Sequence, residues 1–70
     1  MSNKYTAIIQ REDDWWVGWV EEVPGVNCQE RTREELVDSI QEALAEMLEL
    51  NREAARAAAA PDHESELVTA

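Results

Sequence analysis

The segment Trp15 to Glu21 restricts the fold more than any other part of the chain, because it would be apolar on both faces of a β-strand. It reads W-W-V-G-W-V-E, and aromatic and β-branched residues of this kind are common in strands. One face would carry Trp15, Val17 and Trp19, and the other would carry Trp16, Gly18 and Val20. Such a strand is typical of the centre of a sheet, with a helix on one face and a second layer or a partner chain on the other.

Two further strands are predicted around this central one. Tyr5 to Arg11 reads Y-T-A-I-I-Q-R, and the interruption Glu12-Asp13-Asp14 has the length of a hairpin loop, so the two strands should be antiparallel neighbours. Val23-Pro24-Gly25-Val26 is a turn signal, because proline presets the first central angle and glycine accepts the positive φ of a type II turn. A third strand, Val26 to Gln29, is expected to follow.

A long helix is predicted to begin at Arg33. Thr32 precedes Arg33-Glu34-Glu35 in the capping-box pattern, in which the threonine oxygen accepts a backbone N–H and the glutamate reaches back. Apolar residues then recur at three- and four-residue steps and form one stripe that would cover the sheet. These residues are Leu36, Val37, Ile40, Ala43, Leu44, Met47 and Leu48.

The helix is expected to continue through the alanine-rich stretch Ala54 to Ala60 until Pro61 stops it. The fold class is therefore α+β, in a single domain over residues 1–60: a three-stranded antiparallel sheet packed by one long helix. Residues 61–70 form a tail, in which Leu67-Val68-Thr69 has two interpretations. It either adds a fourth strand beside the first after a crossover through the helix, which would give β-β-β-α-β, or it is disordered.

The net charge of the chain indicates which kinds of macromolecule it attracts and which it repels. The chain carries sixteen Asp and Glu residues against six Lys and Arg residues, a formal net charge of −10. Such a field repels the phosphates of free nucleic acid and attracts basic proteins. A protein that itself grips RNA or DNA is the kind of partner that this balance favours. Solubility is the other explanation of the composition.

The acidic residues of the helix gather on one side. At about 100° per residue, six of them fall within an arc of roughly 80°, almost opposite the apolar stripe. They are Glu35, Asp38, Glu42, Glu46, Glu49 and Glu53. Uncompensated like charges at these spacings cost helix stability. The pattern is consistent with a solvated helix or with docking of a basic partner, and these residues are the candidate partner-binding site.

Three tryptophans in a chain of seventy residues are the second unusual feature. A domain of this size buries only about 60% of the surface of its unfolded chain, so self-association is an expected source of stability. Helix packing accounts for the tryptophans on one face, but at least one on the other face should stay partly uncovered in a monomer. Trp15, Trp16 and Trp19 are the candidate interface of a homodimer or higher homo-oligomer.

Candidate catalytic and metal-binding residues are few. Cys28 lies in a predicted strand, and His63 lies in the polar tail without the further ligands that zinc needs. Asp13-Asp14 fits turn chemistry, and the adjacent Glu21-Glu22 point to opposite faces of a strand, so they do not aim at one cation. No catalytic, metal or cofactor site is assigned, and a magnesium-dependent nuclease is the least supported function.

The cellular compartment is inferred from the single cysteine and from the sequence of the N-terminus. One cysteine excludes an internal disulfide, which fits a reducing cytoplasm. Met1 to Lys4 leads into a short apolar alternation instead of a charged region followed by a long apolar core, so no signal peptide or membrane-spanning helix is expected. The expected location is the cytoplasm.

Three pieces occur in a characteristic order over about Lys4 to Leu50: the hairpin with its aromatic residues, then V-P-G-V, then T-R-E-E-L followed by I-Q-E-A-L-A-E-M-L-E. In this order they resemble the HicB-like antitoxin family. The resemblance implies a β-β-β-α-β unit with a partial ribonuclease H-like fold that lacks the catalytic carboxylates. It also implies that the protein binds and neutralises a small basic toxin of the HicA type, which cleaves messenger RNA, and that it forms dimers or larger assemblies.

The chain departs from that family in two respects. Many members carry a C-terminal helix-turn-helix or ribbon-helix-helix segment that binds operator DNA, and this chain is expected to be a short form without one. Glu30 stands where the family often has glycine, so the turn into the helix should differ locally. The alternative function is a stand-alone oligomeric module for protein binding or regulation that has no toxin partner.

Overall fold

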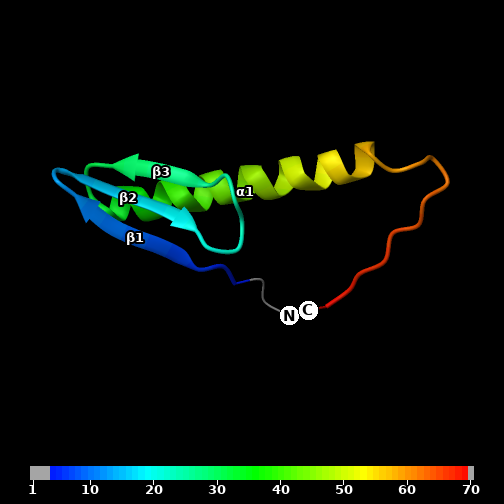
Figure 1. The fold of residues 1–70 in the computed structure, drawn as a ribbon, viewed down its shortest axis with the longest axis horizontal. Coiled ribbons are helices and arrows are strands. Elements are labelled where there is room, and N and C mark those ends of the chain that lie inside the picture. Colours follow the sequence, from blue (N-terminus) through cyan, green and yellow to red (C-terminus); the bar gives the residue numbers. More distant parts are fainter. Residues whose placement is uncertain (1–3, 70) are drawn as a thin grey trace.

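The computed structural model describes residues 4–69 and contains one sheet and one helix. The elements follow in the order β1 (Ala7–Glu12), β2 (Trp15–Val20), β3 (Asn27–Glu30) and α1 (Arg33–Ala57). Both strand pairs are antiparallel, and β2 lies in the centre. α1 lies along one face of the sheet (Figure 1). The predicted α+β class, the three antiparallel strands and the single long helix are confirmed.

The hairpin between β1 and β2 is tighter than the sequence suggested. Glu12 belongs to β1 and pairs with Trp15, so only Asp13 and Asp14 form the turn. Asp13 has a φ of 55°, and a positive φ at the first central position is what the two-residue turns of twisted hairpins require. Aspartate tolerates this conformation better than most residues because its short side chain can form hydrogen bonds to nearby backbone groups.

The turn between β2 and β3 packs into the core. Gly25 has a φ of 97°, which confirms the positive angle predicted for the V-P-G-V sequence and explains why glycine is needed there. The two valines that flank Pro24-Gly25 are almost fully buried, with 6% of Val23 and 1% of Val26 exposed. This turn therefore closes one end of the core and also reverses the chain.

The start of α1 agrees with the predicted cap. The Thr32 hydroxyl oxygen accepts the backbone N–H of Glu35 at 3.1 Å, and α1 begins at Arg33. The Glu35 carboxylate accepts a hydrogen bond from the Thr32 hydroxyl at 2.9 Å. Glu30, at the end of β3, accepts a hydrogen bond from the Ser39 hydroxyl at 2.6 Å. This bond ties the strand that precedes the turn to the second turn of the helix.

The end of α1 corrects the prediction. The helix ends at Ala57 instead of continuing to Pro61. The Ala58 N–H donates to the carbonyl of Ala54 at 3.1 Å, and the Ala59 N–H then donates to the carbonyl of Arg56 at 3.2 Å, which tightens the last turn. A proline disfavours helical backbone in the residue before it. This restriction acts on Ala60, and the tightened turn at Ala58 and Ala59 ends the helix before that residue.

The core lies between α1 and one face of the sheet. Its buried residues are Val20, Val23, Val26, Leu36 and Ile40. Gly18 of β2 faces this core, and a Cβ atom at Gly18 would lie 2.8 Å from the carbonyl oxygen of Ile8 and 2.9 Å from Cδ1 of Ile40. Distances this short are not tolerated, so only glycine lets the helix approach β2 this closely.

The helix is longer than the sheet that it covers. α1 packs mainly on β2 and β3, and every residue from Leu50 to Ala57 is exposed. The second half of the helix extends beyond the strands (Figure 1). Packing therefore stabilises the first half of α1, and the second half depends on its high helix propensity.

Residues 61–69 contain no strand and no helix. After α1 the tail turns back and stays apart from the sheet (Figure 1). Leu67 and Val68 are exposed at 101% and 85%. Of the two interpretations of Leu67-Val68-Thr69, the fourth strand is thus not formed in the described residues.

Two leucines of α1 provide a matched test of this packing. Leu36 is 0% exposed and Leu50 is 57% exposed. Leu36→Ala should lower the free energy of unfolding by about 2–5 kcal/mol, because it opens a cavity under the helix. Leu50→Ala should change it by about 0.5 kcal/mol or less. Urea denaturation followed by circular dichroism measures both variants, and equal losses would contradict the packing described here.

Candidate protein-binding surfaces

One exposed acidic surface runs along α1. The six predicted residues all lie on this continuous helix, and all six are exposed. We call them the acidic face: Glu35, Asp38, Glu42, Glu46, Glu49 and Glu53. At a rise of 1.5 Å per residue the acidic face is about 27 Å long. It points away from the sheet because the opposite side of α1 carries the buried Leu36 and Ile40.

Few positive charges offset the acidic face. Arg52 Nη1 lies 3.5 Å from Glu49 Oε2, and both side chains are more than half exposed, at 63% and 58%. It is the single ion pair within residues 4–69, and exposed pairs of this kind contribute little stability. Glu35 is engaged by the Thr32 cap. The remaining carboxylates repel one another at three- and four-residue spacings, and a basic partner would relieve that repulsion.

An exposed leucine lies beside the acidic face. Leu50 is 57% exposed, and it lines a shallow hollow together with Glu46, Glu49 and Glu53. The periodicity of the apolar stripe did not include Leu50, because this residue lies toward the polar side of the helix. A large apolar residue on a polar surface is the signal that would have identified it. The acidic face thus has an apolar contact point near its C-terminal end.

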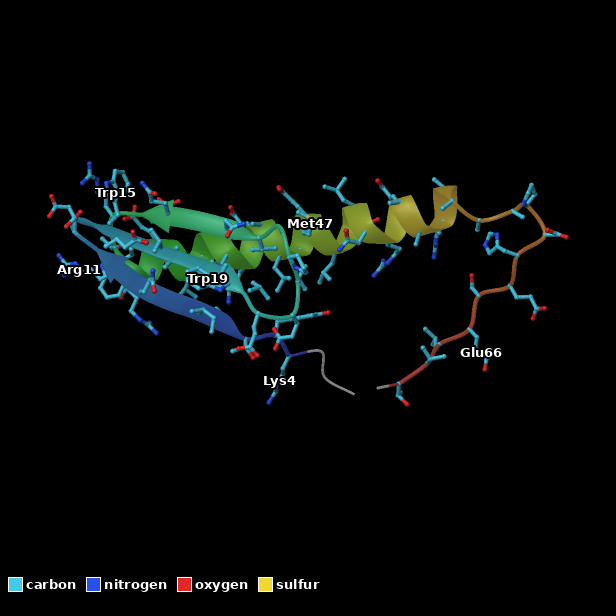
Figure 2. The ribbon with its side chains drawn as sticks, viewed as in Figure 1. Lys4, Arg11, Trp15, Trp19, Met47 and Glu66 are labelled. Carbon is cyan, nitrogen blue, oxygen red and sulfur yellow. The ribbon has the colours of Figure 1, made fainter. Side chains whose placement is uncertain are left out.

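The three tryptophans do not form one surface. Trp16 packs against the core beneath α1. Trp15 and Trp19 lie on the opposite face of the sheet, where no helix covers them, and they lie toward the two ends of β2 (Figure 2). The guanidinium carbon of Arg31 lies 3.9 Å from the centroid of the Trp15 ring, in cation–π contact. Trp19 is 37% exposed.

We call the uncovered side of the sheet the outer face. The strand register places eight residues on it: Ile8, Gln10 and Glu12 of β1, Trp15, Val17 and Trp19 of β2, and Asn27 and Gln29 of β3. The side chains that β2 contributes along the centre are all apolar, whereas those of β1 and β3 are polar except Ile8, and only Glu12 is charged. Trp16 is separated from this surface by the thickness of the sheet, so it takes no part in it.

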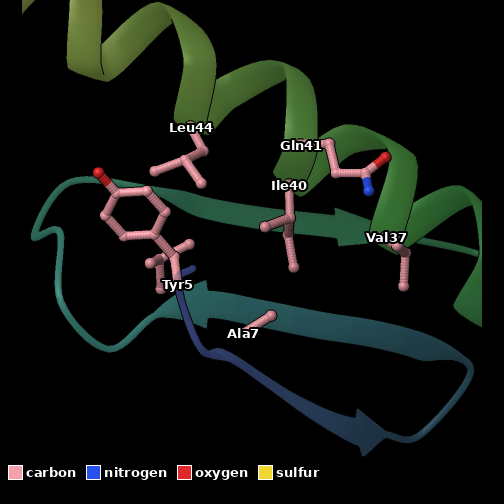
Figure 3. Close-up of a pocket in the computed structure, with 7 residues that line it drawn as sticks. Tyr5, Ala7, Val37, Ile40, Gln41 and Leu44 are labelled. Carbon is pink, nitrogen blue, oxygen red and sulfur yellow. The ribbon is translucent and has the colours of Figure 1, made fainter. Parts of the chain in front are cut away.

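A small apolar pocket lies between the free edge of β1 and the helix. Its lining includes Tyr5, Ala7, Ile40 and Leu44 (Figure 3). The cavity volume is about 160 Å³, and sites for drug-sized ligands are larger, at about 300–1,000 Å³. The pocket is therefore too small to enclose a typical cofactor or substrate.

Two titratable groups have shifted pKa values. The backbone N–H of Thr6 donates to Oε1 of Glu22 at 2.7 Å, and this bond lowers the pKa of the Glu22 carboxyl. Burial raises the pKa of the Cys28 thiol, and the negative charge of Glu30 raises it further. A raised pKa disfavours the thiolate, which is the nucleophilic form of cysteine. Neither environment resembles that of an activated catalytic group.

The other chemical candidates remain apart from one another. Asp13 and Asp14 form the hairpin turn, and the ring of His63 contacts the carbonyl of Ala60 through Nδ1 at 2.7 Å. Within residues 4–69 no three His, Cys, Asp or Glu side chains are grouped so that they could hold a metal ion. Over the same residues, no helix combines the length and the apolar character needed to cross a membrane.

The chain was compared with protein-family models, curated proteins and solved structures. None of the three comparisons found a match. The functional interpretation therefore depends on the two surfaces themselves, the acidic face of α1 and the outer face of the sheet.

Proposed function

We propose that this chain is a HicB-like antitoxin. It acts in the cytoplasm by binding and neutralising a small basic toxin of the HicA type that cleaves messenger RNA. Its own contribution is binding without catalysis, and it uses no cofactor. The observation that carries the proposal is the acidic face, in which six exposed carboxylates have a single neighbouring ion-pair partner.

The acidic face suits a protein whose function is to hold RNA. A nuclease that grips RNA presents lysine and arginine to the phosphates. A rigid row of carboxylates over about 27 Å offers those side chains an alternative set of negative charges. When the face is occupied, the RNA-binding surface of the toxin is no longer accessible to its substrate. Neutralisation by this route needs no chemistry from the antitoxin.

Charge and shape have separate roles in this complex. The net charge of −10 steers a basic partner toward the helix and raises the association rate. Leu50, exposed beside Glu46, Glu49 and Glu53, supplies an apolar contact that becomes buried when the partner docks. Buried apolar contacts slow dissociation more than they affect association. The acidic side chains therefore determine the association rate, and Leu50 lengthens the lifetime of the complex.

Co-expression with the product of the adjacent gene tests the proposal. The expected result is a stable complex with a small basic protein, which weakens as salt is added, and rescue of cells from the growth arrest that this neighbour causes. If no small basic neighbour forms a complex, and growth is indifferent to both proteins, the antitoxin function is wrong.

Charge reversal on the acidic face locates the interface. The variant Glu42→Lys/Glu46→Lys/Glu49→Lys should slow association with the toxin by about tenfold or more at low salt, because it reverses the local field. The matched control Asp62→Lys/Glu64→Lys/Glu66→Lys makes the same change in net charge within the tail. It should slow association much less. Stopped-flow mixing measures both rates, and equal slowing would show that net charge alone matters.

The outer face favours a second candidate function, a stand-alone oligomeric module for protein binding or regulation. This function needs no basic toxin and uses the uncovered apolar side chains of β2, of which Trp19 is 37% exposed. The two candidates differ in their salt dependence. A complex through the acidic face weakens with salt, whereas an apolar association does not.

We also propose that the tail, which lies apart from the sheet in the described structure, can fold back and complete a partial ribonuclease H-like unit, with Leu67-Val68-Thr69 as a fourth strand beside β1. β1 has a free edge, and the apolar pocket along it is lined by Ala7, Ile40 and Leu44. Ten residues from Ala57 to Leu67 reach up to about 33 Å when extended, which is enough to return from the helix end. The strand would run parallel to β1 after the crossover through α1.

Hydrogen exchange tests the fourth strand. If the tail pairs with β1, the β1 amides that do not bond to β2 should be protected in the full chain. Val68→Pro removes a backbone donor from the proposed strand, and it should raise the exchange rate of those amides by about tenfold or more. Glu64→Pro, outside the strand, is the control and should leave them protected. Unprotected β1 edge amides in the unmodified chain would contradict the pairing.

A further inference from the structure

Two of the three tryptophans carry an arginine of the chain over their rings. The guanidinium carbon of Arg31 lies 3.9 Å from the centroid of the Trp15 ring. Arg11 pairs with Trp16 across β1 and β2, and its guanidinium carbon lies 5.7 Å from the centroid of that ring. A cation at such a distance is attracted by the negative face of the ring. The sheet thus already uses guanidinium groups to cover tryptophan rings.

Trp19 has no such cover. Over residues 4–69, no Arg or Lys side chain lies over its ring. Its neighbours in the register of the sheet are Ile8 and Asn27, and neither carries a charge. Trp19 is 37% exposed, whereas the other two tryptophans are half-buried. Its ring is therefore accessible to a cation from another molecule.

A shallow hollow lies beside Trp19 on the outer face. Its volume is about 380 Å³, which falls in the range of about 300–1,000 Å³ that is typical of ligand sites. The outer-face residues that line it are Glu12, Val17, Trp19, Asn27 and Gln29. Val17 and Trp19 supply apolar surface, and the other three supply carboxylate and amide oxygens that accept hydrogen bonds. The hollow therefore combines an aromatic ring with several acceptors.

The charges around the hollow favour a cation. Glu12 is the charged residue of its lining, and Asp13 and Asp14 follow in the adjoining turn. The basic residues at this end of the sheet are Arg11 and Arg31, and both already lie over tryptophans. Three carboxylates thus face two guanidinium groups, in a chain with a net charge of −10. Such a field attracts a cation and repels a phosphate group.

An arginine side chain matches this site better than other cations. Its guanidinium has five N–H donors in one plane, so its edge reaches acceptors while its face stacks on an indole ring. Glu12 accepts one hydrogen bond, from Nε2 of Gln10 to its Oε2 at 3.2 Å, and a carboxylate has about four acceptor positions. A lysine ammonium is more strongly hydrated and has no flat face. A quaternary ammonium has no donor for the acceptors of the hollow.

We propose that the outer face binds an arginine side chain of a partner protein. The guanidinium stacks on Trp19 and donates to Glu12, Asn27 and Gln29, and the aliphatic part of the side chain packs on Val17. The acidic face lies on the other side of the molecule, so a toxin seated on α1 does not reach Trp19. The arginine therefore belongs to a second protein, and the proposal does not depend on the antitoxin function.

Nuclear magnetic resonance titration of the full chain with N-acetyl-arginine amide tests the site. The indole N–H signal of Trp19 and the side-chain amide signal of Gln29 should shift together. The citrulline analogue has the same shape without the charge, and it should bind about tenfold more weakly or worse. The lysine analogue should bind about threefold more weakly or worse, because it lacks the planar donors.

Two pairs of variants locate the binding. Glu12→Gln should weaken binding of the arginine probe by about fivefold or more, because it removes the carboxylate that the guanidinium contacts. Asp14→Asn is the matched control, since it makes the same change in net charge in the adjoining turn, and it should weaken binding much less. Trp19→Leu keeps an apolar side chain but removes the ring, and it should also weaken binding by about fivefold or more. The signal of Gln29 reports binding in that variant.

Circular dichroism checks the fold of each variant, and the comparison of Glu12→Gln with Asp14→Asn decides the result if Trp19→Leu does not fold. Binding should persist in Glu42→Lys/Glu46→Lys/Glu49→Lys, which alters the acidic face alone. Equal binding of the arginine and citrulline probes would overturn the proposal. So would shifts confined to α1, or a Trp19 signal that moves with protein concentration and not with the probe, because the latter shows that a second copy covers the ring.

Discussion

The close approach of α1 to the central strand holds this domain together. Leu36 and Ile40 of the helix pack over Gly18 of β2, where a Cβ atom would meet backbone and side-chain atoms at less than 3 Å. Leu36 is fully buried by this contact, and Ile40 is 3% exposed. Because the chain has only seventy residues, there is no second core that could compensate for its loss. The position of every other surface feature depends on this packing.

Over residues 4–69, one helix covers one face of one sheet, so the far side of the helix and the far side of the sheet stay uncovered on opposite sides of the molecule. The far side of α1 carries the acidic face, and the far side of the sheet carries the outer face. One is highly charged, whereas the other combines four apolar and four polar side chains, of which only Glu12 is charged. The two surfaces are therefore separate candidate binding sites.

Local patterns in the sequence predicted much of this arrangement. The position of the sheet was predicted from the two-residue period of Trp15 to Val20 and from the turn at Pro24-Gly25. The start of the helix was predicted from Thr32.

The features that depend on distant contacts were not predicted. Val23 and Val26 flank a turn, and only the helix above them makes them part of the core. α1 ends four residues before Pro61, whereas a proline restricts only the residue before it, so alanine propensity and Pro61 alone did not predict this end. Leu50 falls outside the apolar stripe on the polar side of α1, and this position is the sequence signal for its exposure.

We propose that the acidic face binds a basic protein. Titration of isotopically labelled chain with the small basic product of the adjacent gene, followed by nuclear magnetic resonance, tests it most directly. If the acidic face is the binding site, the backbone signals of Asp38, Glu42, Glu46 and Glu49 should shift on binding, while the indole signal of Trp19 should move little. Shifts confined to the sheet, with the α1 signals unchanged, would contradict the claim.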